Sequence, residues 1–303
     1  MRKAMLTCLL MLAVFAAAPA WGDALRLSVT TDLEASGLLD VLAPEFKKDM
    51  GVDVQVNPGN LGTVIQEAMS GGSDVVFMSD PARQERLVAR GFGLQRHEGM
   101  SVDFLIVGPD DDPAGAGGAD AAACLRAVAA SENMFVSRGD GSATHEREKE
   151  LWKATGLPLQ VGKTTLTERG ERMTFESVRP EGMAGFLSIG DGMGRALDAA
   201  EEKRAYVLTD RVTYVRYKYG RPQGLRLEAV CEGDGRLIES YGIVLVNPEK
   251  QPHVRLDLAE IFARWLVSGR GQRIIADYRL FGRRLFLPDS KMAQSRAVPA
   301  SGQ

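Results

Sequence analysis

Short apolar runs alternate with longer segments of helical periodicity in the first part of the chain. Residues 25–30 alternate apolar and polar side chains, as a half-buried strand does, whereas Leu38, Leu42 and Phe46 recur every four positions, as on one face of a helix. The pattern continues through strands at 52–56, 74–78 and 104–107 and helices at 63–70 and 81–90. Repeated strand–helix alternation predicts a mainly parallel sheet with helices on both faces.

The alternation stops at Gly108-Pro109 and then restarts, which indicates a second α/β lobe. The expected elements are helices at 119–130, 143–155 and 195–203 and strands at 134–136 and 205–208. A later strand, 243–246, ends in Asn247-Pro248, much as 104–107 ends at a proline, and helices at 256–267 and 271–278 follow it.

We interpret the two strand-then-proline segments as the places where the chain crosses between lobes. The N-lobe is then expected to comprise residues 23–107 and 242–287, and the C-lobe residues 108–241. Residues 288–303 are expected to form a disordered tail.

Residues 1–22 have the pattern of a secretory signal peptide. Arg2 and Lys3 are positive, an apolar run covers 6–15, and small residues follow. A spanning helix needs about 20 apolar residues, which this run lacks, and no later segment is long and apolar enough. We therefore expect export to the periplasm.

Composition narrows the classes of function further. The chain is 45% hydrophobic and 25% charged, which is typical of a globular protein, and its net charge of −3 comes without a basic patch for nucleic acid. Its three His and three Cys residues lack metal-ligand spacing, so we expect no metal site. Cys124 and Cys231 could pair after export, but two separate buried thiols are the favoured interpretation.

Three strand-to-helix junctions carry the candidate chemistry, because ligands of parallel sheets bind where strands end and helix N–H groups point outward. The first junction contains Thr30 and Thr31, followed by Asp32 and Glu34. It is equally well interpreted as a capping box of Thr31 and Glu34, with Asp32 as a first-turn acid.

The second junction suits an anion. Arg138, Ser142 and Thr144 all donate hydrogen bonds, and Gly139 and Gly141 allow the backbone to approach a ligand. The alternative is that Arg138 pairs with Asp140 at the surface.

The third junction is the small-residue turn 190–194, which fits neither common nucleotide-binding glycine motif. A hydrolase using Ser142 and His145 is an alternative from another class. Against it, the GxSxG motif is absent, and a His just inside a helix more often packs or caps.

Several blocks of sequence at these junctions resemble the tungstate-binding proteins of TupA type, which are the periplasmic components of tungstate ABC importers. The blocks are Thr30-Thr31 with Ser36 to Asp40, Asp103 to Pro109 with Asp111 to Gly115, Ser137 to Asp140 with Thr144-His145, Gly192 to Gly194, and Tyr206 to Arg211. The resemblance runs in register from about Leu25 to Pro288.

The resemblance implies a two-lobed class II periplasmic binding protein that closes on one oxyanion, tungstate or a relative such as molybdate. It implies a monomer that hands its ligand to the membrane subunits of an ABC permease, with no catalysis and no cofactor. The ligand contacts that it implies are Thr30, Thr31, Arg138, Ser142 and Thr144, with backbone N–H groups of Gly192, Met193 and Gly194.

Three departures from that family's pattern bear on the ligand. Asp32 and Asp191 stand where the family typically has uncharged polar residues, and about fifteen extra residues lie within 159–186. A carboxylate about 5 Å from a dianion costs on the order of 7 kcal/mol at a dielectric near 20. A micromolar affinity corresponds to only about 8 kcal/mol. Both aspartates must therefore turn away, be protonated or, with Glu34, bind a cationic or amine-bearing solute instead.

Overall fold

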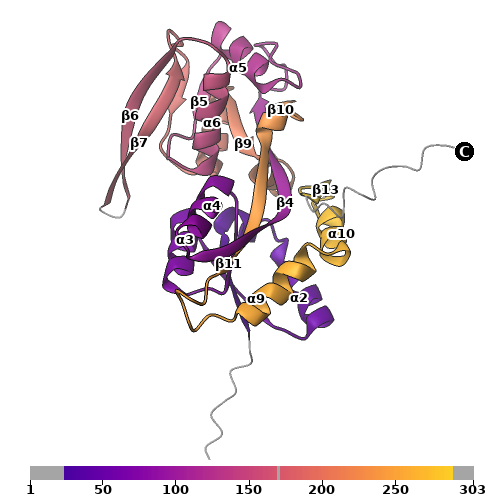
Figure 1. Cartoon of the computed structure of the whole chain (residues 1–303). Helices are drawn as coiled ribbons and strands as arrows, with labels where there is room; N and C mark the ends of the chain where they lie inside the picture. The colour runs from indigo at the N-terminus through magenta and orange to yellow at the C-terminus, as the bar shows by residue number, and fades with distance from the viewer. Residues whose placement is uncertain (1–23, 169–170, 289–303) are drawn as a thin grey trace, which may run out of the picture.

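The computed structural model describes residues 24–168 and 171–288 (Figure 1). The expected signal peptide, and all of the expected tail except Pro288, lie outside these residues. One large sheet runs through the molecule in the order β2-β1-β3-β11-β4-β9-β5-β8, with β10 and β14 also pairing with β4. Helices cover it, which confirms the predicted α/β fold of mainly parallel strands.

The lower half of Figure 1 is built largely from the first hundred residues and the last fifty that the structure describes. Its parallel strands are β1 (Leu25–Thr30), β2 (Val54–Gly59) and β3 (Val75–Met78). Its helices are α1 (Thr31–Ala35), α2 (Leu39–Met50), α3 (Leu61–Ser70), α4 (Pro81–Ala89), α9 (Leu256–Leu266) and α10 (Gly269–Asp277). All but the short α1 match predicted helices.

Two long antiparallel strands connect the halves: β4 (Gly93–Gly108) and β11 (Ile238–Val246). The first part of β4 pairs with β11, and its residues 104–107 pair with β9 (Tyr206–Asp210) in the other half. Sequence periodicity predicted only the apolar last part of β4. The lobe boundaries at 107/108 and 241/242 stay predictions.

In the upper half, β5 (Phe135–Ser137) lies between β9 and β8 (Phe186–Ser188). The helices here are α5 (Ala121–Ala130), α6 (Ala143–Ala154), α7 (Met193–Lys203) and α8 (Arg211–Gly220), of which only α8 was not predicted. Short elements complete the fold: β10 (Glu228–Cys231), the 3₁₀ turn Gly235–Leu237, β12 (Arg279–Leu280), β13 (Arg283–Arg284) and β14 (Leu287–Pro288).

The two cysteines lie in the core of this half. Both thiols are free and buried, on α5 and β10, and they lie close enough to interact. The hydrogen bond with Cys231, together with burial, raises the pKa of the Cys124 thiol. The thiols are therefore buried as expected, but they are neighbours.

The segment 159–186, where about fifteen extra residues were expected, contains an antiparallel hairpin, β6 (Leu159–Glu168) and β7 (Glu171–Pro180), which extends beside α6 at the margin of the molecule (Figure 1). Within the described residues, no helix has the length and apolar character needed to cross a membrane.

Candidate functional site

The loop between β5 and α6 holds Arg138 in a fixed position. Nε of Arg138 donates to Oδ2 of Asp140 at 2.7 Å, and Nη1 donates to Oγ1 of Thr144 at 3.4 Å. The pair with Asp140 that the sequence left as an alternative therefore forms. It is not at the surface, since the side chains of Arg138 and Asp140 are only 21% and 15% exposed. Among the described residues, Nη2 of Arg138 has no hydrogen-bond partner, so it can donate to a ligand.

Ser142 and Thr144 lie in the same loop. Ser142 is the N-cap of α6, where its Oγ accepts from the backbone N–H of His145 at 3.3 Å. Thr144 is buried and accepts from Arg138. The structure thus brings the three predicted residues of this junction together at the start of one helix.

The turn 190–194 lies against this loop. The N–H of Ile189 donates to the carbonyl of Ser137 at 3.1 Å, and that of Asp191 donates to the carbonyl of Arg138 at 3.3 Å. Gly192 is the N-cap of α7 and offers no side chain to the first N–H groups of the helix, at Met193 and Gly194. The backbone N–H donors at the start of α7 therefore lie beside Arg138. A helix N-terminus whose N–H groups have no side-chain cap favours an anion.

Asp191 does not oppose that arrangement, because its carboxylate faces outward. The side chain is 57% exposed, Oδ1 accepts from the N–H of Gly192 at 2.6 Å, and Oδ2 lies 3.7 Å from Nε of Arg195. Of the three options that the sequence left for Asp191, the structure supports turning away from the cleft.

The first junction differs from the predicted capping box. Thr30, rather than Thr31, is the N-cap of α1, and its side chain makes no capping hydrogen bond. Thr31 is already helical and exposed. Thr30 is only 5% exposed, and within the described part of the chain its Oγ1 has no hydrogen-bond partner. Its hydroxyl is therefore available to a ligand.

Of the three options that the sequence left for Asp32, the structure does not support turning away to solvent. Its carboxylate accepts a hydrogen bond from the hydroxyl of Tyr241, a buried residue of β11. Glu34, in contrast, is exposed. The predicted cation-binding set of Asp32, Glu34 and Asp191 therefore does not come together.

Two acidic residues that sequence reasoning missed lie near Asp32. Asp210 caps α8, and its Oδ1 accepts from the N–H of Thr213 at 2.7 Å. Burial, and then the charge of Asp32, raise the pKa of Asp210, and the charge of Arg138 partly offsets this rise. Glu239 is 8% exposed, and burial and the charge of Asp32 raise its pKa to about 8. Asp210 stands in the block Tyr206 to Arg211 that carries the family resemblance, but nothing marked it there as a site residue, and Glu239 stood in no motif.

A further buried acid lies behind the loop of Arg138. Glu148 of α6 is 1% exposed, and its Oε1 has no partner among the described residues. Burial raises the pKa of Glu148 to about 8, against the lowering effects of Ser137 and the Arg138 backbone. At neutral pH this carboxyl is therefore largely protonated and does not repel an anion held by Arg138.

The side chains of Ser142 and His145 are not arranged as a nucleophile and its base. His145 is buried, its Nδ1 accepts from the N–H of Gly141 at 3.0 Å, and its ring meets Phe175 edge-on with centroids 5.6 Å apart. The Ser142 hydroxyl interacts with the backbone of His145, as a helix cap does. The geometry therefore supports the capping interpretation rather than the hydrolase.

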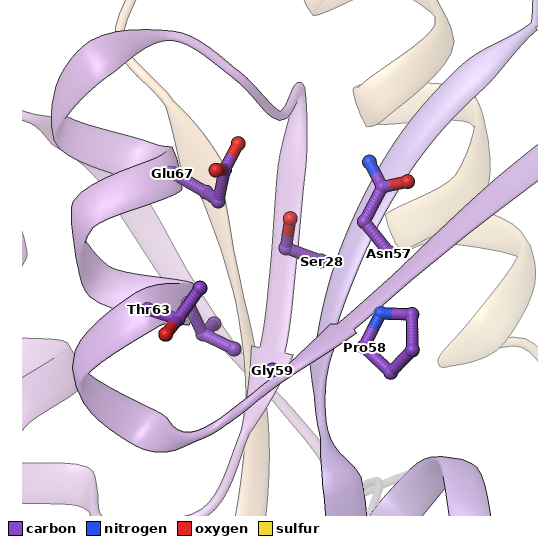
Figure 2. Close-up of a pocket in the computed structure, with 7 residues that line it drawn as sticks. Ser28, Asn57, Pro58, Gly59, Thr63 and Glu67 are labelled. Atoms are coloured by element: carbon purple, nitrogen blue, oxygen red, sulfur yellow. The ribbon is translucent and has the colours of Figure 1, made fainter. Parts of the chain in front are cut away.

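A cavity of about 300 Å³ lies under α3, beside the edge strand β2 (Figure 2). Its lining residues are Ser28, Asn57, Pro58, Gly59, Thr63, Val64 and Glu67. The lining includes one carboxylate and no lysine or arginine, which makes it unsuited to an anion. Within the described residues, no three His, Cys, Asp or Glu side chains are grouped to hold a metal ion.

Comparison with known families agrees with this fold. The model of a family described as the PBP superfamily domain matches residues 17–270, so the chain belongs to that superfamily. The chain is 34% identical to the tungstate-binding protein TupA of Peptoclostridium acidaminophilum over 269 residues. This aligned stretch covers 87% of this chain and 85% of that protein. It is 33% identical to a putative ABC transporter anion-binding protein of Haloferax volcanii, over 88% of this chain and 72% of that protein.

Comparison with solved structures also places the chain among tungstate-binding proteins. The tungstate-binding protein TupA of Desulfovibrio alaskensis superposes with a TM-score of 0.79 at 36% identity, covering 89% of this chain and all of that one. The tungstate ABC transporter structure from Geobacter sulfurreducens gives 0.69 at 37% identity, over 84% and 99% of the two chains. Within the superfamily, the chain therefore belongs to the family of TupA-type tungstate-binding proteins.

Proposed function

We propose that the protein captures tungstate, or a related tetrahedral oxyanion such as molybdate, and delivers it to the membrane subunits of an ABC permease. The observation that carries this proposal is that Nη2 of the largely buried Arg138 has no hydrogen-bond partner among the described residues. It lies in a loop next to the start of α7, which has no side-chain cap. A guanidinium, hydroxyls and backbone N–H groups are all donors, which is the chemistry that a fully deprotonated oxyanion requires. The relatives' names point to the same ligand class.

Ligand contacts are proposed residue by residue. Arg138 supplies the charge, and the hydroxyls of Thr30, Thr31, Ser142 and Thr144 supply further hydrogen bonds. The N–H groups of Met193 and Gly194, exposed by the lack of a side chain at Gly192, complete the donor set. The protein is proposed to act in the periplasm as a monomer, by binding without turnover and without a resident cofactor.

The proposal is tested by titration calorimetry of the mature protein with tungstate and molybdate. A charge-assisted hydrogen bond contributes about 1.5–3 kcal/mol, so Arg138→Ala should weaken binding about 10- to 100-fold. Arg138→Lys keeps the charge but loses the planar fork, so its affinity should lie between the two. Arg179→Ala, on the exposed hairpin, is the matched control and should bind as the wild type does.

Two results would contradict these assignments separately. If the wild-type protein gives no binding heat with either oxometalate, the proposed function is wrong. If Arg138→Ala is folded and binds with unchanged affinity, the ligand lies elsewhere.

A further inference from the structure

A buried serine hydroxyl without a partner faces the cavity under α3. Ser28 of β1 is 1% exposed, and its Oγ has no hydrogen-bond partner among the described residues. Ser28 lines the cavity, and Figure 2 shows its hydroxyl between the side chains of Glu67 and Asn57. Leaving a buried hydroxyl unpaired is unfavourable, so whatever occupies the cavity must supply its partner.

The strand register places a second polar side chain beside Ser28. Ser28 is in register with Asn57 of β2 on one side and with Val76 of β3 on the other. Val76 belongs to an apolar cluster that includes Val64 of α3, as the covered face of a sheet in an α/β protein normally does. This face of the sheet therefore changes from apolar at β3 to polar at β1 and β2, where the cavity lies.

Helix α3 supplies the opposite wall. Thr63 and Glu67 both line the cavity, because they are four residues apart and lie on the same face of the helix. The Thr63 hydroxyl donates to Oδ1 of Asn60, the N-cap of α3, at 3.1 Å, so its oxygen acts as an acceptor toward a ligand. A Cβ built at Gly72 would lie 1.8 Å from Oε2 of Glu67, so the carboxylate occupies space that a side chain at Gly72 would fill.

The lining carries one negative charge and no positive charge. Glu67 is the one ionisable side chain among the lining residues, and within the described part of the chain it forms no ion pair. The complementary ligand is a cation that donates hydrogen bonds, as an ammonium group does through its N–H bonds. A calcium ion is disfavoured, because it needs more oxygen ligands, usually with several carboxylates, than this lining provides.

We propose that the cavity is a second ligand site, which binds a small organic cation with a primary ammonium group. Glu67 pairs with the ammonium group, Ser28 and Asn57 make further hydrogen bonds with it, and Val64 and Pro58 contact the apolar part of the molecule. The volume of about 300 Å³ is at the lower end of the range for small-molecule sites. The site shares no residue with the proposed oxyanion site, so it does not depend on tungstate binding.

The experiment is an NMR titration of the isotope-labelled protein with n-butylammonium chloride, at constant ionic strength in a buffer without amines. Saturable shifts are expected at the backbone N–H groups of Ser28, Asn57, Thr63 and Glu67. n-Butanol has the same chain without the charge and should bind at least about tenfold more weakly. Magnesium chloride alone should not reproduce the shifts.

Two variants and a control test the assigned contacts. Glu67→Gln keeps the shape of the side chain but removes the charge, so butylammonium affinity should fall about tenfold or more. Ser28→Ala removes the unpartnered hydroxyl, so the protein should fold without ligand and bind butylammonium about 2- to 10-fold more weakly. Glu85→Gln, at an exposed position on α4, should bind as the wild type does.

The proposal is overturned if the shifts do not saturate, since water alone then fills the cavity. It is also overturned if butanol binds as tightly as butylammonium, or if Glu67→Gln binds with unchanged affinity, since the carboxylate then holds no ammonium group. Shifts of the same residues with magnesium chloride alone would assign an inorganic cation instead. The comparison with butanol uses the wild-type protein, so the test remains decisive if Glu67→Gln fails to fold.

Discussion

At the level of single residues, the loop between β5 and α6, here called the anion loop, requires a glycine at position 139. Gly139 has φ +64°, and a Cβ built there would lie 2.0 Å from Oγ of Ser188 and 3.4 Å from the backbone N of Gly190. The loop and the turn at the start of α7 can approach each other because position 139 has no side chain.

Gly139→Ala should therefore lower the free energy of unfolding by about 1–3 kcal/mol, the usual cost of a non-glycine residue in a strained conformation. Urea unfolding of the ligand-free protein measures this change. Gly192→Ala is the control, because its φ is −65° and a Cβ there meets nothing within 4 Å. Equal stability of the two variants would show that the approach of loop and turn tolerates a Cβ.

The sequence identified the residues of single junctions and missed contacts between distant ones. Arg138, Ser142 and Thr144 were singled out as candidates because they stand within seven consecutive positions between a predicted strand and helix. The partner of Asp32, Tyr241, is 209 positions away, and only the folded sheet brings them together. A local pattern could not show which way the Asp32 carboxylate turns.

At the level of elements, the β6–β7 hairpin supports the anion loop from the side. The ring of Phe175 on β7 lies against Gly141 and meets His145 edge-on. Glu176 forms a 2.8 Å ion pair with Lys153 of α6, but both side chains are about half exposed, so this pair contributes little. The aromatic contact therefore links the hairpin to the proposed site more strongly than the ion pair does.

Phe175→Ala should loosen that loop. Removing a half-buried ring should cost about 1–2 kcal/mol of stability and weaken oxyanion binding several-fold, because His145 and Gly141 lose the surface that holds them. Thermal unfolding and calorimetry measure the two effects. Val161→Ala, at a position 62% exposed on the other strand of the hairpin, should change neither quantity, and a matching loss there would assign the effect to the hairpin as a whole.

Element prediction succeeded where apolar periodicity was strong and failed where pairing alone defines a strand. Apart from the short α1, the helices of the lower half and the short buried strands were predicted within a few residues of their bounds. The first part of β4, which includes Arg96, His97 and Glu98, is too polar for its pattern to indicate a strand, yet it pairs along β11. The hairpin was expected only as extra residues, because Thr and charged side chains fill half of the positions in its two strands and weaken the apolar alternation.

At the level of the whole molecule, two glutamates of the described chain are nearly fully buried: Glu148 on α6 and Glu239 on the strand that joins the halves. Burial raises the pKa of each to about 8, from about 4.5 in an unfolded chain. Between these values the folded protein binds more protons than the unfolded chain, so the free energy of unfolding falls as pH rises. His97 and His145, whose pKa values burial lowers, act in the opposite direction, but only below about pH 7.

The ligand-free protein should therefore lose about 1–2 kcal/mol of stability from pH 7 to pH 8, since each such group contributes up to about 1.4 kcal/mol per pH unit. Urea unfolding at both pH values measures this loss. Glu148→Gln should reduce it by removing one of the two titrations without touching the connecting strand, whereas Glu249→Gln should leave it unchanged. If stability instead rises over this interval, the two glutamates are ionised in the folded protein. The neutral state assigned to Glu148 behind Arg138 would then be wrong.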